Sequence, residues 1–130
     1  MCDLLTIVTA IAIVESGGDP LAVGDAGDAI GILQIHREVI TDVNRVYKTT
    51  YVWPDSARDP VASREIARLY LSYWGDYYAK KHNVPLTPRI YAACWNGGGP
   101  HGPDKHKVKP YVERVLRTLK EVEQSTKSEN

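Results

Sequence analysis

One acidic residue near the start of the chain, Glu15, has a setting that suits acid–base chemistry. Glu15 follows an apolar run over residues 4–14 that only two threonines interrupt, and two glycines come shortly after it. We predict a largely buried helix that ends at these glycines, because glycine readily adopts the left-handed conformation of helix ends. Low-dielectric packing and the negative end of the helix dipole are both expected to raise the pKa of Glu15. A general acid that works near neutral pH needs such a raised pKa.

The elements that must position this carboxylate are mostly helical. Apolar spacing and helix start and stop signals predict helices over residues 4–16, 37–47, 60–81, 88–95 and 110–124. Three of these helices follow a capping residue, which is Asp3, Asp59 or Thr87. A proline comes directly after Asp59 and Thr87, at the first helical position that proline favours.

The segments between the helices are predicted to be irregular. Residues 17–30 are rich in glycine and aspartate, which indicates a long loop with room for a small hairpin. Residues 48–58 predict a second loop, and residues 101–109 predict a basic, solvated loop. Residues 125–130 predict a disordered tail. The four histidines are scattered along the sequence, and we expect no metal site.

The composition is that of one soluble globular domain. A chain of 130 residues fits a single core. Sixteen basic and sixteen acidic residues balance, which argues against nucleic-acid binding driven by net charge. The cysteines, Cys2 and Cys94, are too few for a disulfide framework, so we expect two unpaired thiols. No apolar run is long enough to span a membrane, and the first one lacks the positive flank of a signal peptide.

Four short segments occur in an order that matches a known family. They are Glu15-Ser16-Gly17, Gly31-Ile32-Leu33-Gln34-Ile35, Ala93-Cys94-Trp95-Asn96-Gly97-Gly98 and Tyr111-Val112. Their types, order and approximate spacing resemble the superfamily of goose-type lysozymes and soluble lytic transglycosylases. The resemblance covers residues 4 to about 117, and the four segments together make it specific.

This resemblance implies a fold and a reaction. The fold would be α+β and mostly α, a lysozyme-like single domain, with a catalytic domain over residues 1–124 and the tail after it. The reaction would be cleavage of the β-1,4 bond between N-acetylmuramic acid and N-acetylglucosamine in peptidoglycan, with Glu15 as the catalytic acid. We expect peptidoglycan glycan strands as the partner, a monomer, no nucleic acid and no cofactor.

The resemblance also places further residues at the substrate. The substrate-binding residues are then Ser16, Asp28, Gly31, Gln34, Trp95, Asn96 and Tyr111. For three of them a purely structural role stays open: Gln34 as a core amide bonded to backbone, Asn96 as a left-handed helix cap, and Tyr111 as a core aromatic.

Two positions depart from the family pattern. Trp95 stands where the family has a tyrosine, and its only polar atom is an N–H donor, which excludes roles that need a hydroxyl. Leu33 replaces a methionine, a change that conserves volume.

The position of Asp25 bears on the type of reaction. Lytic enzymes usually have a serine six residues before Gly31, whereas goose-type lysozymes resemble this chain in having an aspartate there. An inverting hydrolase needs a second carboxylate, about 6.5–9.5 Å from the acid, to activate water. A lytic transglycosylase needs none, because the muramyl 6-hydroxyl attacks and a 1,6-anhydro ring forms. Asp25 is the candidate base, with Asp28 next to it; both could instead be turn residues.

The sequence leaves two wider alternatives open. The domain could be catalytically inactive and either bind glycan or serve structurally in a larger wall-penetrating assembly, or it could act on chitin-type glycans. We expect action at the bacterial cell wall, in the periplasm or outside the cell. This chain shows no export signal, so we expect delivery by another protein, as for a phage-type lysin, or as part of a longer chain.

Overall fold

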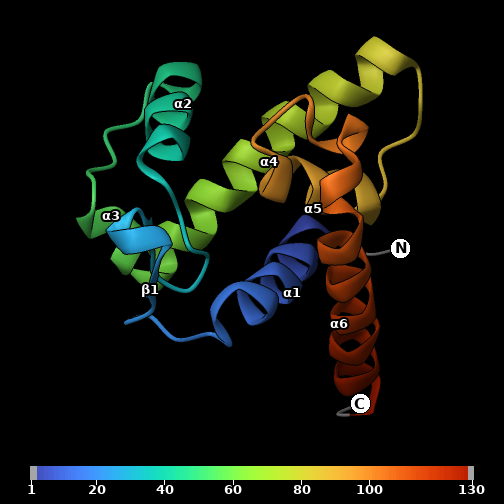
Figure 1. Ribbon diagram of the computed structural model, residues 1–130, viewed down its shortest axis with the longest axis horizontal. Helices are drawn as coiled ribbons and strands as arrows, with labels where there is room; N and C mark the ends of the chain where they lie inside the picture. Colours follow the sequence, from blue (N-terminus) through green and yellow to red (C-terminus); the bar gives the residue numbers. More distant parts are fainter. Residues whose placement is uncertain (1–2, 129–130) are drawn as a thin grey trace. The chain divides into compact units, whose positions relative to one another are not determined.

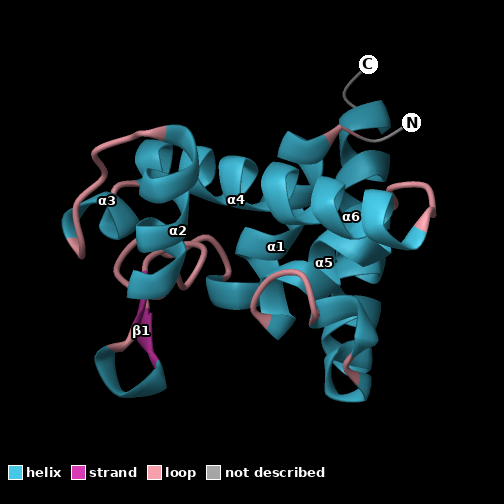
Figure 2. Cartoon of the chain, turned by 90° about the horizontal axis from the view of Figure 1, so that it is seen from above, coloured by secondary structure: helices cyan, strands magenta, loops and turns pink. Residues whose placement is uncertain are grey.

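The computed structural model describes residues 3–128, and most of them are helical (Figure 1). The α-helices of this part are α1 (Leu4–Ser16), α2 (Arg37–Tyr47), α3 (Asp55–Arg58), α4 (Pro60–His82), α5 (Pro88–Gly97) and α6 (Lys109–Ser128). The shorter elements are β1 (Val23–Gly24), β2 (Ala29–Ile30) and the 3-10 turns η1 (Asp25–Gly27), η2 (Gly102–Asp104) and η3 (His106–Val108). Figure 2 shows the small share of strand in this helical chain.

Side-chain caps confirm the predicted helix starts. Asp3 Oδ1 accepts a hydrogen bond from the Thr6 N–H at 2.9 Å, at the start of α1. Asp59 Oδ2 accepts from the Ala62 N–H at 3.0 Å in the first turn of α4. The Thr87 side chain caps α5 in the same way. Each cap supplies an acceptor to an N–H group that has no partner within its helix.

Helix α1 ends where the sequence predicts. Gly17 and Gly18 have φ values of 68° and 81°, the left-handed region in which glycine carries no steric penalty. The helix is not buried on every side, however. Ile7, Val8 and Ile11 are at most 1% exposed, whereas the side chain of Ile13, near the helix end, is 44% exposed.

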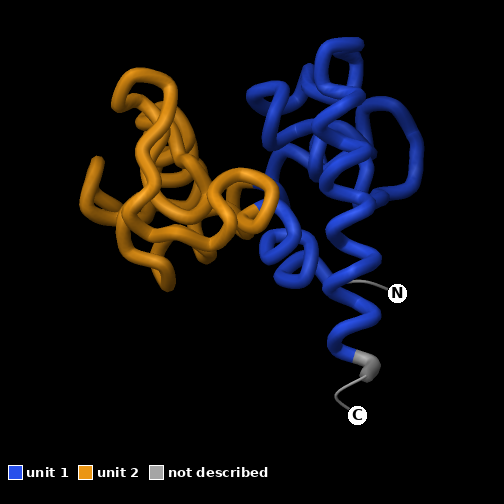
Figure 3. Tube along the Cα trace, turned by 60° about the horizontal axis from the view of Figure 1, so that its bottom comes forward, with its two compact units in different colours: residues 1–11, 71–130 blue, residues 12–70 orange. Residues whose placement is uncertain are grey.

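The chain divides into two compact units (Figure 3). Unit 2 comprises residues 12–70, and unit 1 comprises residues 1–11 together with residues 71–130, of which 3–11 and 71–128 are described. The predicted site residues Glu15, Ser16, Asp25, Asp28, Gly31 and Gln34 belong to unit 2. The other three, Trp95, Asn96 and Tyr111, belong to unit 1.

Unit 2 contains the predicted hairpin. Strands β1 and β2 pair antiparallel, with Val23 opposite Ile30. A further antiparallel bridge joins Ile30 to Ile35, so the chain after β2 turns back on itself. The buried apolar side chains of this unit include Ile32, Leu33, Ile35, Ile40, Val43 and Ile66.

Unit 1 is built around α5. This helix packs against α6 and η2. The buried apolar side chains here include Leu71, Ile90, Ala92, Val108, Val112, Val115 and Leu119. Cys94 is also buried in α5 and is a free thiol, while Cys2 lies outside the described residues.

Two loop predictions need correction. Residues 48–58 were predicted to be a loop, but Asp55–Arg58 form α3, in which Ala57 is fully buried. A four-residue helix is too short to show a helical period, so the pattern could not reveal it. The basic loop over residues 101–109 contains the turns η2 and η3, which likewise give no periodic signal.

The last helix runs further than predicted. α6 continues through Ser128, four residues beyond the predicted end, so residues 125–128 are helical and not part of a disordered tail. Neither glycine nor proline occurs there to end the helix, and propagation needs no further apolar residues. Residues 129–130 lie outside the described part. Among the described residues, no helix combines the length and apolar content that crossing a membrane requires.

Candidate active site

The last turn of α1 carries Glu15, the predicted acid, and Ser16, whose side chain holds the helix end by hydrogen bonds. Glu15 lies in the last turn of α1 and is half-buried. Ser16 Oγ donates a hydrogen bond to the Ile32 carbonyl at 2.7 Å. It also accepts from the backbone N–H groups of Gly18 at 3.1 Å and Asp19 at 3.2 Å. The Ser16 hydroxyl therefore connects the helix end to the segment over residues 31–35, a structural role that the sequence did not predict.

The turn at Gly31 explains why a glycine is needed there. Its φ is 82°, and a Cβ atom at this position would lie 2.1 Å from the Ala57 carbonyl oxygen. The Gly31 N–H also donates to the Ala22 carbonyl at 2.9 Å. The close approach that requires a glycine is thus to the protein's own α3, and substrate binding at Gly31 stays a prediction.

The Gln34 side chain forms hydrogen bonds to the backbone of this turn. Its backbone has a φ of 51°, and its Nε2 donates to the carbonyl oxygens of Ala22 at 3.1 Å and Gly31 at 3.0 Å. Its Oε1 faces Gly24, where an added Cβ would come within 2.4 Å of that oxygen. The structural alternative for Gln34, a core amide bonded to backbone, is therefore confirmed for its Nε2 group. Among residues 3–128, Oε1 has no hydrogen-bond donor.

The candidate base Asp25 lies at the hairpin turn beside a histidine. Asp25 Oδ2 is 2.9 Å from His36 Nε2, with side chains 67% and 43% exposed. Asp28 is exposed in the same turn and donates its backbone N–H to the Asp25 carbonyl at 3.1 Å. Both aspartates are therefore turn residues, but the Asp25 side chain also has the His36 imidazole as a partner.

Sequence reasoning missed His36. The residue follows Ile35, whose pairing with Ile30 brings it back to the hairpin whose turn begins at Asp25. Eleven positions separate the two partners, and no periodic pattern links them. Only a correct prediction of the bridge between Ile30 and Ile35 could have revealed the pair.

The candidate residues of unit 1 lie on α5 and α6. Trp95 is half-buried and Asn96 is exposed, both within the last turn of α5. Gly98, with φ 81°, takes the left-handed position after the helix, so the cap alternative for Asn96 is wrong. Tyr111 is 5% exposed, and the Arg114 guanidinium lies 5.8 Å from its ring centroid. The Tyr111 ring thus occupies a core position.

Two glycines bring the basic loop against α5. A Cβ on Gly97 would lie 2.4 Å from Gly102 Cα, and a Cβ on Gly102 would lie 2.1 Å from the Ala93 carbonyl oxygen. Lys105 Nζ donates to the Gly97 carbonyl at 2.8 Å. The loop over residues 101–109 is therefore anchored on the helix that carries Asn96, while its basic side chains stay exposed as predicted.

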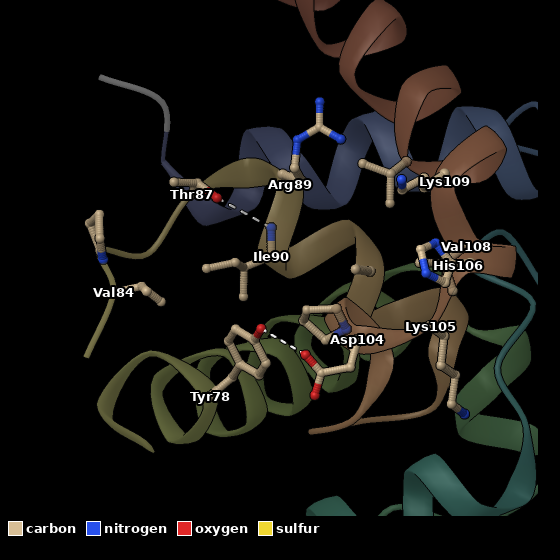
Figure 4. A pocket seen from close by; sticks show the side chains of 14 residues that line it. Tyr78, Val84, Thr87, Arg89, Ile90, Asp104, Lys105, His106, Val108 and Lys109 are labelled. Carbon is tan, nitrogen blue, oxygen red and sulfur yellow. Dashed lines mark hydrogen bonds between the residues drawn. The ribbon is translucent and has the colours of Figure 1, made fainter. Parts of the chain in front are cut away.

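Unit 1 also holds a pocket of about 440 Å³ between this loop, α5 and the ends of α4 and α6 (Figure 4). Its wall includes apolar Val84 and Ile90 and the basic side chains of His106 and Lys109. Asp104 is engaged there by the Tyr78 hydroxyl, which donates at 3.1 Å. None of the predicted site residues lines it. Among the described residues, no group of three or more histidine, cysteine or acidic side chains is placed to hold a metal ion.

The fold and these motifs define a lysozyme-like protein. A chain in the crystal structure of Aeromonas hydrophila PliI in complex with Meretrix lusoria lysozyme is similar, with a TM-score of 0.72, 20% identity and coverage of 90% of this chain and 93% of that one. Tapes japonica lysozyme is similar with a TM-score of 0.68, 21% identity and 87% coverage of each chain. Residues 3–109 match the family described as the transglycosylase SLT domain, and the chain belongs to that family. The comparison with curated proteins gave no match.

Proposed function

We propose that this protein cleaves the β-1,4 bond between N-acetylmuramic acid and N-acetylglucosamine of peptidoglycan, at the bacterial cell wall, with Glu15 as the general acid. The observation that carries the proposal is the setting of Glu15. It lies half-buried at the end of an apolar helix, in a chain that belongs to the transglycosylase SLT family. The adjoining Ser16 holds that helix end to the turn that contains Gln34.

The first chemical step needs only Glu15. Its carboxylic acid donates a proton to the glycosidic oxygen as the bond to the anomeric carbon breaks. In the hydrolytic reaction, Asp25 takes a proton from a water molecule, and the resulting hydroxide adds to the anomeric carbon from the opposite face. This assignment rests on the presence of a second carboxylate in the same unit as Glu15.

The family suggests a second reaction at the same bond. In a lytic transglycosylase, Glu15 first acts as the acid and then, as carboxylate, takes the proton of the muramyl 6-hydroxyl. That oxygen attacks the anomeric carbon, and a 1,6-anhydro ring closes without water. The family name favours this route, and the Asp25 carboxylate favours hydrolysis.

Three further side chains are proposed to bind the sugar chain directly. The Gln34 Oε1 is an acceptor suited to a sugar hydroxyl or amide N–H. The exposed amide of Asn96 is suited to hydrogen bonding, and the half-buried indole of Trp95 to stacking on a sugar ring. Tyr111 is proposed to support the site from its buried position.

The decisive experiment replaces Glu15 by glutamine. Glu15→Gln keeps the shape of the side chain but removes its acid, and we expect at least a ~100-fold lower rate of release of soluble fragments from purified peptidoglycan. Glu38→Gln is the matched control, because Glu38 is an exposed glutamate in the first turn of α2. Full activity in Glu15→Gln would remove this residue from the mechanism.

Mass spectrometry of the released fragments separates the two reactions. Products that end in 1,6-anhydromuramic acid identify a lytic transglycosylase and leave Asp25 without a catalytic role. Products with a reducing-end muramic acid identify a hydrolase. Binding to insoluble peptidoglycan with no release of fragments would contradict catalysis altogether.

A further inference from the structure

We propose that His36 is a positioning residue that holds Asp25 in the orientation in which it activates water. This inference rests on the proposed function, because it assigns a role to the environment of the candidate base. Neither the family patterns in the sequence nor the comparisons with known proteins point to His36.

The first support is the contact itself. At 2.9 Å, His36 Nε2 is within hydrogen-bond distance of Asp25 Oδ2. A protonated Nε2 donates to that oxygen and leaves Oδ1 able to accept a proton. Because the Asp25 side chain is 67% exposed, little else restricts its rotation. An exposed pair of this kind contributes at most about 1 kcal/mol to stability, so the contact is not needed to hold the fold.

The second support is the backbone at Asp25. Asp25 and Ala26 have φ values of 48° and 56°, so two successive residues with a Cβ lie in the left-handed region. Each such residue costs roughly 1–2 kcal/mol, less for aspartate than for alanine. Strained backbone of this kind clusters at functional sites, and one of the two strained residues here is the one that contacts His36.

The third support is the hydrogen-bonded framework that holds Asp25 and His36. His36 directly follows Ile35, which is bridged to Ile30 at the end of the hairpin that contains Asp25. Gln34 hydrogen-bonds within the turn between them, and Ser16, the last residue of α1, connects that turn to the helix that carries Glu15. Hydrogen bonds within unit 2 thus connect the segments that carry the acid, the candidate base and His36.

The chemistry of the step is balanced with these groups. Water loses a proton to Asp25 Oδ1 while its oxygen bonds to the anomeric carbon. The bond from that carbon to the leaving oxygen breaks, and this oxygen takes the proton of Glu15. His36 keeps its own proton throughout and acts only by fixing Asp25. A misplacement of about 1 Å in such a group can cost as much as 10²-fold in rate.

The test is a double-mutant cycle measured by steady-state kinetics on a soluble glycan of alternating N-acetylglucosamine and N-acetylmuramic acid. We expect His36→Ala to lower kcat about 10-fold or more, with KM changed less than twofold. His36→Gln should restore most of kcat, because its amide N–H can also donate to Asp25. In an Asp25→Asn background, His36→Ala should cause no further loss, since the group on which His36 acts is already disabled.

A control and several outcomes make the test decisive. His82→Ala removes an exposed histidine of unit 1 that stacks on Tyr78, and it should leave kcat unchanged. Thermal unfolding of each variant verifies that it is folded. Wild-type kcat in His36→Ala, or an equal loss from it in the Asp25→Asn background, overturns the role of His36. Wild-type kcat in Asp25→Asn overturns it together with the proposed base, while the Glu15→Gln result still decides the proposed function separately.

Discussion

Ser16 offers a direct test of how the end of α1 is held. The Ser16→Ala substitution removes one hydroxyl and leaves the helix backbone otherwise unchanged. It deprives the Ile32 carbonyl, in a residue only 7% exposed, of a donor at 2.7 Å. It also removes the acceptor of two N–H groups, those of Gly18 and Asp19.

The expected cost follows from these contacts. Loss of the bond to a buried carbonyl costs roughly 1–3 kcal/mol. The two N–H groups belong to exposed residues, so water replaces their acceptor and they add little. Alanine is the better helix former, which offsets up to about 0.5 kcal/mol. We therefore expect Ser16→Ala to lower the free energy of unfolding by about 1.5 kcal/mol.

Urea titration at equilibrium measures this change, and glycan cleavage measures its consequence for Glu15. Thr41→Ala is the matched control, because the Thr41 hydroxyl is exposed and bonds only to the Arg37 carbonyl of its own helix, at 3.3 Å. That variant should stay within ±0.5 kcal/mol of the wild type. A Ser16→Ala protein of unchanged stability but raised KM would refute this reasoning and restore Ser16 as a substrate-binding residue.

Three other predictions concern the backbone and the buried thiol. Gly31→Ala should lower the free energy of unfolding by at least about 3 kcal/mol, because its Cβ would lie 2.1 Å from the Ala57 carbonyl oxygen. Gly18→Ala, with similar φ but open space around it, should lower it less in the same urea titration. Ala26→Gly should stabilise the protein by about 0.5–1 kcal/mol in thermal unfolding, because a φ of 56° strains alanine but not glycine. A destabilised variant would contradict the left-handed turn. Burial raises the pKa of Cys94 from 9.0 to about 12, so only the unfolded thiol ionises between these pH values. Stability should therefore fall as pH rises from 9 to 12, by up to about 1.4 kcal/mol per pH unit, and Cys94→Ala should remove that contribution.

Local signals predicted most of the helical framework. The caps at Asp3, Asp59 and Thr87 and the glycines after α1 act through neighbours within a few residues, so the sequence displays them directly. The predictions were wrong where an element has no period of its own. Helix α3 has only four residues, and its Ala57 owes its burial to contacts that no local pattern specifies.

The roles of the site residues were less predictable than their positions. The sequence predicted that Gly31 and Gln34 belong to the site, but it did not predict which residues they contact. Gly31 is required by the carbonyl of Ala57, twenty-six positions away, and Gln34 bonds to Ala22, twelve positions away. Those partners are set by how the hairpin and α3 fold together.

By itself, the amino-acid sequence determined the helical class, the helix starts and the location of Glu15 at a helix end, because caps, proline, glycine and apolar spacing act over one or two turns. Tertiary structure alone decided that Ser16 braces that end and that Asp25 pairs with His36. The pair and the brace join residues 11 and 16 positions apart. Such contacts form only when the chain folds back on itself, and no pattern in either segment specifies its partner.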